Sequence, residues 1–511
     1  MCRPLSRREF IRYGALVGAS VPLLKIDRLL AEEEDRGAGV PMHLELVTVT
    51  DTRAVITWFT GDPSRLDEFG RPAPIAKPGR VLIGTSPHAS SWEPVGTHAP
   101  TPYHYVELRG LRPGTTYYWR AESAGVPAVP TAFSPGHAEI AAPPSFTTLR
   151  PPPGREVLRV AWLNDLHIGE HTSGLAYSDD RLPRGGFPPG FPVDPDDPYW
   201  RTMAKAAVTE SKERGCRLLL ANGDLTNEAE PDRVRESKRM LDVFGSLGGR
   251  RTVTPQTKPT YFVTRGNHDR THSGPEWASC SPVRGRPELR DCFLDTFKAG
   301  FDRGSTRFSV VAGDGRVRYR FVGLDSNEAD ATGVMPQHEL DYLEAELDRG
   351  DATIPLCHHP VADIALYTGF VPTRVGVEPA QAARFREVIA RHDNVAAIYN
   401  GHTHRNFRTT STDTGSVPYF EGGAVKEYPG GYTTVRLYEG GFMVNFWKTR
   451  EPRARAWSEV SRGEYLGLYP YYTLGSFDDR NWVHTFNATG RRRRVRRASA
   501  DPTDPSPALA R

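Results

Sequence analysis

Clusters of metal-binding side chains recur in this 511-residue chain, each directly after a short apolar stretch. Aspartate and histidine dominate, with one asparagine, and these side chains supply the oxygen and nitrogen donors that bind divalent and trivalent metal ions. The clusters are Asp165-Leu-His167, Gly223-Asp224, Gly266-Asn267-His268-Asp269, His358-His359-Pro360 and Gly401-His402-Thr403-His404. One such pair occurs by chance in many proteins, but five in series predict a site for more than one metal ion.

The apolar stretches before the clusters have the length and composition of buried β-strands. They are Val160 to Leu163, Leu218 to Ala221, Tyr261 to Thr264, Ile354 to Cys357 and Val395 to Tyr399. Helical spacing is found at Tyr199 to Arg214, Asp232 to Gly245, Gln337 to Leu347 and Arg384 to Ile389. Alternating strands and helices favour an α/β fold, whose strands deliver polar groups to one edge of a sheet. Ligands far apart in the sequence are therefore expected to meet in one crevice.

The region 42–148 has a different pattern, with short β-type runs separated by proline and glycine. The runs are His43 to Thr50, Ala54 to Thr60, Arg80 to Gly84, Tyr105 to Leu108 and Thr116 to Ala121. This pattern predicts a small antiparallel β-sandwich. The segment from Leu111 to Trp119 resembles the corner before a late strand of fibronectin type III modules, and Val55 to Trp58 resembles their tryptophan strand.

Taken together, the five clusters resemble the calcineurin-like metallophosphoesterase family from Asp165 to His404. The resemblance implies a four-layer α/β/β/α sandwich that hydrolyses phosphate mono- or diesters with two ions of iron, manganese or zinc. A β-sandwich in front of such a domain is the layout of purple acid phosphatases and their relatives. By resemblance, the first ion is held by Asp165, His167 and His404, the second by Asn267, His358 and His402, and both by a bridging Asp224. A hydroxide held between the ions would then attack the phosphorus.

Three further polar residues follow ligand positions. In the family, the histidine at the position of His268 faces the phosphate, so His268 is expected to stabilise the phosphoryl group or protonate the leaving oxygen. Asp269 is expected either to orient that imidazole or to be solvated surface. His359 is expected to support the neighbouring ligands or to line the pocket.

One position departs from the purple acid phosphatases. They place an iron-binding tyrosine three residues after the bridging aspartate, where this chain has Asn227, and they lack the histidine present here as His167. The site therefore resembles that of bacterial cyclic-nucleotide phosphodiesterases and general phosphoesterases more closely. We expect no tyrosinate charge-transfer absorption.

The N-terminus carries a targeting pattern. Arg7-Arg8-Glu9-Phe10-Ile11 precedes a mostly apolar stretch from Tyr13 to Leu24, and this order resembles the twin-arginine signal, whose machinery exports folded proteins. We expect residues 1–40 to be signal and spacer, and the protein to be secreted, periplasmic or attached to the cell wall. Cleavage of the signal and its retention as an anchor both stay open.

The rest of the chain is expected to form a catalytic domain at 157–450, a packing segment at 451–490 and a disordered tail at 491–511. The tail carries seven arginines against two aspartates, within a net charge of +3 for the whole chain. The remainder is thus slightly acidic and favours no nucleic-acid surface. The tail could contact an anionic wall polymer or membrane surface, and a solvated tail is the alternative.

The five cysteines have no spacing typical of a metal site. Cys216 and Cys357 are expected in the core, whereas Cys280 and Cys292 could pair in an oxidising compartment.

Two functions stay in competition. The leading one is a phosphoesterase that acts on a small phosphate ester or a wall- or lipid-derived one. The other is a cell-surface binding protein that uses the β-sandwich, with the α/β domain as scaffold.

Overall fold

The computed structural model describes residues 39–67, 71–131, 135–174, 191–192, 194–327, 333–368, 374–464 and 469–486. The predicted export signal and the arginine-rich tail lie outside these residues. Among the helices that are described, none is long and apolar enough to cross a membrane.

The N-terminal region is a sandwich of two antiparallel sheets, as predicted. One sheet contains β1 (Val40–Val49), β2 (Arg53–Leu66), β3 (Pro72–Pro74) and β6 (Tyr103–Arg109). The other contains β5 (Glu93–Thr101), β4 (Lys77–Gly84), β7 (Thr116–Ser123), β8 (Val126–Pro127) and β9 (Ser145–Thr147). Alternate residues such as Ile56, Trp58, Val81 and Trp119 fill the space between the sheets. A short helix, α3 (Pro135–Ala141), precedes β9.

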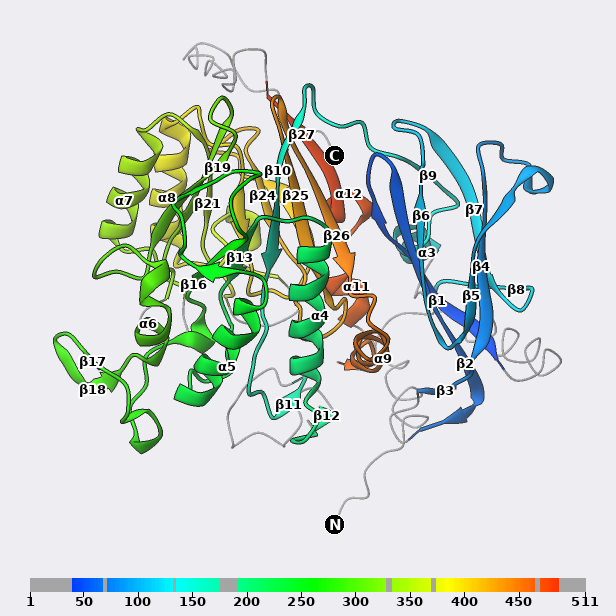
Figure 1. Cartoon of the computed structure of the whole chain (residues 1–511), viewed down its shortest axis with the longest axis horizontal. Coiled ribbons are helices and arrows are strands. Elements are labelled where there is room, and N and C mark those ends of the chain that lie inside the picture. Colours follow the sequence, from blue (N-terminus) through cyan, green and yellow to red (C-terminus); the bar gives the residue numbers. More distant parts are fainter. Residues whose placement is uncertain are drawn as a thin grey trace, which may run out of the picture.

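Two seven-stranded sheets form the centre of the second region (Figure 1). The first has the order β14 (Ser246–Leu247), β16 (Thr260–Thr264), β13 (Leu218–Asn222), β10 (Glu156–Leu163), β25 (Gly431–Tyr438), β26 (Gly441–Lys448) and β27 (Asn481–Thr485). The second has the order β15 (Thr252–Val253), β19 (Phe308–Gly313), β20 (Arg318–Gly323), β21 (Ala352–Leu356), β22 (Ile398–Asn400), β24 (Pro418–Glu421) and β23 (Phe407–Thr410). Parallel pairing of β10, β13 and β16, and of β20, β21 and β22, aligns their carboxyl ends.

The two sheets pack face to face and helices cover their outer faces. Trp162 on β10 stacks on Tyr399 of β22, with ring centroids 4.2 Å apart. On the outer face of the second sheet, Val322 and Ile398 pack against α7 (Gln337–Leu347) and α8 (Pro379–Arg391). The other outer face is covered by α4 (Tyr199–Glu213) and α5 (Pro231–Asp242), next to α6 (Cys292–Phe297). The four-layer α/β/β/α arrangement expected from the sequence is therefore confirmed.

Small hairpins extend from this core. One pairs β11 (Thr172–Ser173) with β12 (Phe191–Pro192), and another pairs β17 (Pro282–Val283) with β18 (Arg286–Arg290). Cys280 and Cys292 form a disulfide with Cα atoms 5.0 Å apart, so these two residues do pair. Cys216 and Cys357 are free and buried, as expected of core residues.

The segment after Lys448 joins the two regions. It contains α9 (Pro452–Ser461), α11 (Tyr469–Thr473) and α12 (Phe477–Arg480), followed by β27. Strand β27 pairs with β26, so the sheet extends past the expected boundary at residue 450. The Arg480 guanidinium donates to the carbonyls of Leu46 and Val47 on β1, which ties this segment to the sandwich.

Candidate metal centre

All of the predicted ligands lie at the carboxyl ends of parallel strands. Asp165 and His167 follow β10, Asp224 follows β13, and Asn267 lies in a short 3-10 helix after β16. His358 follows β21, and His402 and His404 follow β22, so both sheets contribute to one site. The apolar strands fix the backbone, and the first polar residues beyond them lie over the sheet edge.

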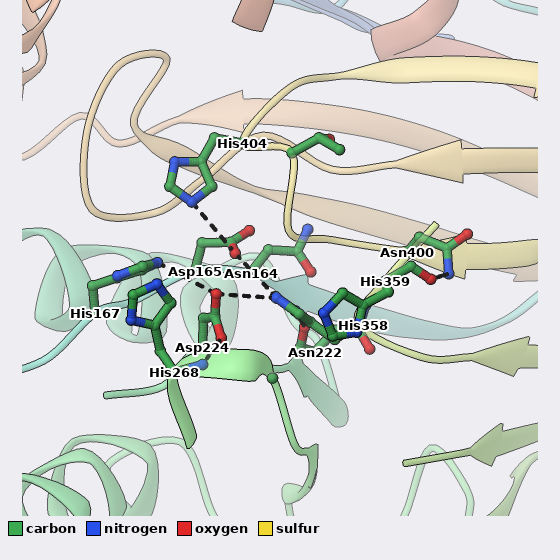
Figure 2. Close-up of polar contacts among 12 residues, drawn as sticks. Asn164, Asp165, His167, Asn222, Asp224, His268, His358, His359, Asn400 and His404 are labelled. Atoms are coloured by element: carbon green, nitrogen blue, oxygen red, sulfur yellow. Dashed lines mark hydrogen bonds and ion pairs between the residues drawn. The ribbon is translucent and has the colours of Figure 1, made fainter. Parts of the chain in front are cut away.

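Donor atoms of these residues form groups compact enough to hold a cation. Asp165, His167 and His404 form one group whose donor atoms lie within 4.8 Å of one another. Asp224, His358 and His402 form another group at the same spacing. In Figure 2, His404 points at Asp165 and His358 points at Asp224, with separations of 3.6 Å and 3.0 Å between nitrogen and carboxylate oxygen.

Asp224 lies between the two sides of the centre. Its Oδ2 is 3.0 Å from His358 Nε2 and 3.6 Å from His167 Nε2. It also joins His167 and His268 in a third compact group of donors. The Asp224 carboxylate thus faces both His167, which the resemblance assigns to the first ion, and His358, which it assigns to the second. A ligand that bridges two ions has to lie in such a position.

The backbone at the centre is strained. Asp165, His167, Asp224, His402 and His404 all have positive φ, between 44° and 71°. This left-handed conformation is uncommon for residues other than glycine, asparagine and aspartate, and it persists only where the surrounding structure enforces it. Its concentration at predicted ligands marks these turns as functional.

Two glycines of the clusters leave room for the ligands. A Cβ on Gly266 would lie 2.2 Å from Asp224 Oδ1, and one on Gly223 would lie 2.4 Å from His358 Nδ1. Both contacts are shorter than any real Cβ approach. Glycine is therefore required before Asp224 and Asn267 because a side chain would displace a neighbouring ligand.

Several donor atoms are buried without a hydrogen-bond partner, which fits a metal site. They are both carboxylate oxygens of Asp165, both ring nitrogens of His167, Asn267 Oδ1 and His402 Nδ1. Leaving one buried polar atom unpaired costs about 1–3 kcal/mol. Metal coordination would satisfy these atoms together, so the residues present fit divalent cations.

Without a metal ion, the histidines of the centre differ in protonation: burial acts to lower the pKa of His358, but Asp224 outweighs it and raises this pKa to about 9, whereas two other imidazoles are held neutral. Burial lowers the pKa of His402 to about 3, and burial together with Lys426 lowers the pKa of His167 well below its usual value. Both imidazoles are therefore neutral at pH 7 and keep a lone pair for a metal ion. At Asp224, burial acts to raise the pKa, but His358 and His268 outweigh it and hold the carboxylate ionised.

The structure places His268 beside the metal centre, whereas Asp269 is buried behind the Asp224 turn. The His268 ring lies near His167, with centroids 4.5 Å apart, and its Nδ1 is 2.7 Å from the carbonyl oxygen of Asn227. Asp269 instead accepts hydrogen bonds from the backbone of Leu225, Thr226 and Gly266 and from the Thr226 hydroxyl. The expectation that Asp269 orients the imidazole is wrong, and so is the solvated alternative, because Asp269 is fully buried. Its role is to hold the Asp224 turn.

His359 lies beside the ligands. Its ring is 4.7 Å from that of His402 between centroids, and its Nδ1 is 2.9 Å from the Ser326 hydroxyl. It is buried, and its Nε2 has no hydrogen-bond partner. It thus lies where it can support His402, in line with the expectation from the sequence.

Glu427 is a residue that the sequence reasoning missed. Its Oε1 lies 2.6 Å from His404 Nδ1, and its Oε2 is 3.1 Å from Lys426 Nζ. A carboxylate on the outer nitrogen of a histidine fixes its tautomer and points the other nitrogen inward. No spacing signal could have shown this residue, because Glu427 is separated from His404 by a long segment that contains β23 and β24.

Comparison with known proteins identifies the class. Residues 158–406 match the family model of calcineurin-like phosphoesterases, so this part of the chain is a calcineurin-like phosphoesterase domain. Together with the clustered aspartate and histidine donors, this match is the basis of the function proposed below.

Individual relatives are distant. This chain is 26% identical over 212 residues to a protein of Synechococcus sp. described as a probable cyclic nucleotide phosphodiesterase. The match covers 40% of this chain and 64% of that protein, so less than two thirds of the relative is spanned. Among solved structures, PhoD is 13% identical with a TM-score of 0.35, covering 79% of this chain and 85% of that one. A purple acid phosphatase of yellow lupin is 15% identical with a TM-score of 0.35, covering 81% and 73%.

Proposed function

We propose that the protein is an exported phosphoesterase that hydrolyses phosphate mono- or diesters with two metal ions at the described centre. The observation that carries this proposal is the position of Asp224, whose carboxylate faces donors on both sides of the centre. Export through the twin-arginine pathway is supported by the Arg7-Arg8 pattern, and the disulfide agrees with an oxidising compartment.

The protein's own residues would divide the work as follows. Asp165, His167 and His404 would hold one ion, Asn267, His358 and His402 would hold the other, and Asp224 would bind both. When bound, such ions activate water and neutralise charge on the phosphoryl oxygens. The strained turns fix the donors before substrate arrives, and so do the buried contacts of His404 with Glu427 and of the Asp224 turn with Asp269. Little reorganisation is then needed during the reaction.

His268 is proposed as the group that meets the phosphate. Its Nδ1 is engaged by the Asn227 carbonyl, so Nε2 is the nitrogen directed at the Asp224 side of the centre. In the protonated ring, Nε2–H can donate to a phosphoryl oxygen or to the leaving oxygen. Asn227, at the position of the purple-enzyme tyrosine, thus contributes its backbone rather than a side-chain ligand.

The test compares hydrolysis of p-nitrophenyl phosphate and bis(p-nitrophenyl) phosphate by the wild type and by Asp224→Asn. The variant should lose activity by on the order of a hundredfold or more on whichever ester the wild type hydrolyses. Asp413→Asn is the matched control, because the Asp413 side chain is 39% exposed and pairs with Arg386 in the same domain, away from the metal centre. Unchanged hydrolysis by Asp224→Asn would refute the proposal, and the ratio of the two esters separates monoesterase from diesterase activity.

A further inference from the structure

A cavity separate from the metal centre lies between the sandwich and the sheet that contains β10, β25 and β26. Its volume is about 280 Å³, and six arginines line it, together with one acidic residue, Glu213, and with three threonines and Trp447. The arginines are Arg53, Arg109, Arg159, Arg214, Arg436 and Arg450. Arg159 lies on β10 and Asp165 follows the end of that strand, so the two Cα atoms are separated by at most about 20 Å at 3.3 Å per residue.

The sheets bring like charges together at this cavity. Arg53 on β2 lies directly opposite Arg109 on β6, and Arg159 on β10 lies directly opposite Arg436 on β25. Residues opposite each other in an antiparallel pair share one face, and like charges there are destabilising. Two such pairs face the same cavity from two different domains.

The carboxylates that form ion pairs with these six arginines do not balance their positive charge. Glu107 contacts Arg53, Arg109 and Arg214. Glu156 and Asp51 contact Arg436, and Glu156 also contacts Arg159, whereas Glu213 contacts Arg450. Four carboxylates therefore serve six guanidinium groups, and of the four only Glu213 lines the cavity. Glu210, near Arg214 and Arg450, adds little further negative charge below pH 7, because burial raises its pKa to about 7. An excess of up to two positive charges is therefore left facing the cavity.

The guanidinium groups are partly held in place before any ligand arrives. Arg214 stacks on the Trp447 ring at 3.4 Å from its centroid and donates to the hydroxyl of Tyr432. Arg436 is fixed by Asp51 and Glu156. Arg53 and Arg109 share only Glu107, so they have donors left for a ligand.

We propose that this cavity binds a doubly charged tetrahedral oxyanion of the phosphate or sulfate class. Such an anion matches the excess of two charges, and guanidinium groups recognise its oxygens through paired N–H donors. The cavity far exceeds the share of one water molecule, about 30 Å³, so an anion fits with some of its hydration water. Free phosphate and the phosphate group of a small phosphomonoester share this chemistry.

The experiment measures binding of sodium phosphate, sodium sulfate and glycerol phosphate to the full-length protein by calorimetry, against sodium chloride of equal ionic strength. It is carried out in the Asp224→Asn background as well as in the wild type, so that binding at the metal centre is separated from binding at the cavity. Binding of phosphate or sulfate should persist in Asp224→Asn. Preference for glycerol phosphate over both inorganic anions would assign the cavity to phosphomonoesters.

The deciding variant is Arg53→Gln/Arg109→Gln in both backgrounds. It should weaken oxyanion binding at least tenfold, while the protein stays folded in chloride, because Arg214 still pairs with Glu107. Arg80→Gln/Arg120→Gln is the matched control, since these arginines share Glu122 in the same sandwich away from the cavity. Absence of oxyanion binding in Asp224→Asn, or unchanged affinity in Arg53→Gln/Arg109→Gln, would overturn the proposal.

Discussion

Glu427 links the metal centre to the buried polar groups behind it. Besides His404, Glu427 contacts Lys426 and accepts a hydrogen bond from the Ser173 hydroxyl. The Lys426 ammonium group in turn lies 2.6 Å from Glu170 Oε1. The carboxylate is almost fully buried and held on both oxygens. His404 is thereby fixed in orientation before a metal binds.

Replacing Glu427 by glutamine should weaken metal affinity by about 10–100-fold, because the His404 tautomer is no longer fixed. Metal affinity is measured by competition with a chelator at pH 7. Glu346→Gln is the control, since Glu346 is a buried partner of Arg320 elsewhere in the domain. Equal affinities of the Glu427→Gln variant and the wild type would show that the contact has no orienting role.

Glu210 predicts a pH dependence of stability. Burial raises its pKa to about 7 from 4.5, although the backbone N–H groups of Arg450 and Glu451 act in the opposite direction. The native carboxyl keeps its proton at a pH where the unfolded one has lost it. Its stabilising contribution is therefore fully present below pH 4.5 and is lost as the pH rises through about 7.

In Glu210→Gln this loss should be absent. The free energy of unfolding of the wild type relative to the variant should fall by roughly 3 kcal/mol at most between pH 4.5 and 8. Urea unfolding at a series of pH values measures it. Parallel pH profiles for the two proteins would contradict the assignment.

The sequence reasoning placed seven ligand candidates directly after strands, and the structure brings the donor atoms of six of them, all but Asn267, into compact groups. It did not predict the contacts of Asp269 or Glu427. Asp269 turns back onto the Asp224 loop, and Glu427 arrives from the segment between β24 and β25. Both contacts depend on tertiary packing and leave no spacing signal.

At the scale of elements, β1 depends on a side chain from α12. The pairing of β1 with β2 shifts register between Leu46 and Thr48, and this bulge leaves carbonyls of β1 without strand partners. Arg480 donates to the carbonyls of Leu46 and Val47, and Asn481 donates to that of Val47. The bulge is therefore stabilised by the C-terminal segment.

Arg480→Ala should lower the free energy of unfolding by about 3 kcal/mol or more, because several buried carbonyls lose their donor. Denaturant unfolding followed by tryptophan fluorescence measures the change. Arg318→Ala is the control, as the Arg318 side chain is 45% exposed and should contribute less than about 1 kcal/mol. A loss no larger than that of the control would mean that the bulge needs no support from Arg480.

Most elements were predictable because their apolar periodicity is clear. The helix at Gln337–Leu347 and the strand at Leu218–Asn222 lie where the sequence places them. Strand β5 was missed because Glu93–Thr101 contains two prolines and a glycine and has no regular apolar alternation. Strand β27 was missed because Asn481–Thr485 becomes a strand only by pairing with the edge of β26.

At the scale of the whole molecule, a buried ionic cluster joins the sandwich to the phosphoesterase domain. Glu45 on β1 contacts Lys448 at the end of β26 and Arg462 after α9, and it accepts a hydrogen bond from the Tyr428 hydroxyl at 2.6 Å. Burial acts to raise the pKa of Glu45, but Lys448 and Arg462 outweigh it and hold the carboxylate ionised. The two regions thus share one set of buried charges.

Glu45→Gln should destabilise the whole chain by about 3–5 kcal/mol, because two buried cations lose their carboxylate. Thermal unfolding should stay a single transition at a lower temperature. Glu122→Gln is the control, since Glu122 is equally buried but pairs with half-exposed arginines within the sandwich. Two separate transitions in the wild type would contradict this coupling.

The same cluster bears on the alternative that the sandwich is an independent binding module. Deleting residues 42–148 would take Glu45 away from Lys448 and Arg462 and uncover the core that packs against Val47 and Val55, so the remaining domain is expected to be destabilised. A truncated domain that keeps full hydrolytic activity would show the sandwich to be dispensable for catalysis and free to serve adhesion.

The most direct test of the account is the metal content of the purified protein, measured together with its hydrolysis of phosphate esters before and after chelation. The account predicts two ions per chain, loss of hydrolysis when they are removed, and recovery when manganese, zinc or iron is returned. Asp224→Asn should bind fewer ions and recover no activity. Hydrolysis at the full rate by metal-free protein would contradict the central claim.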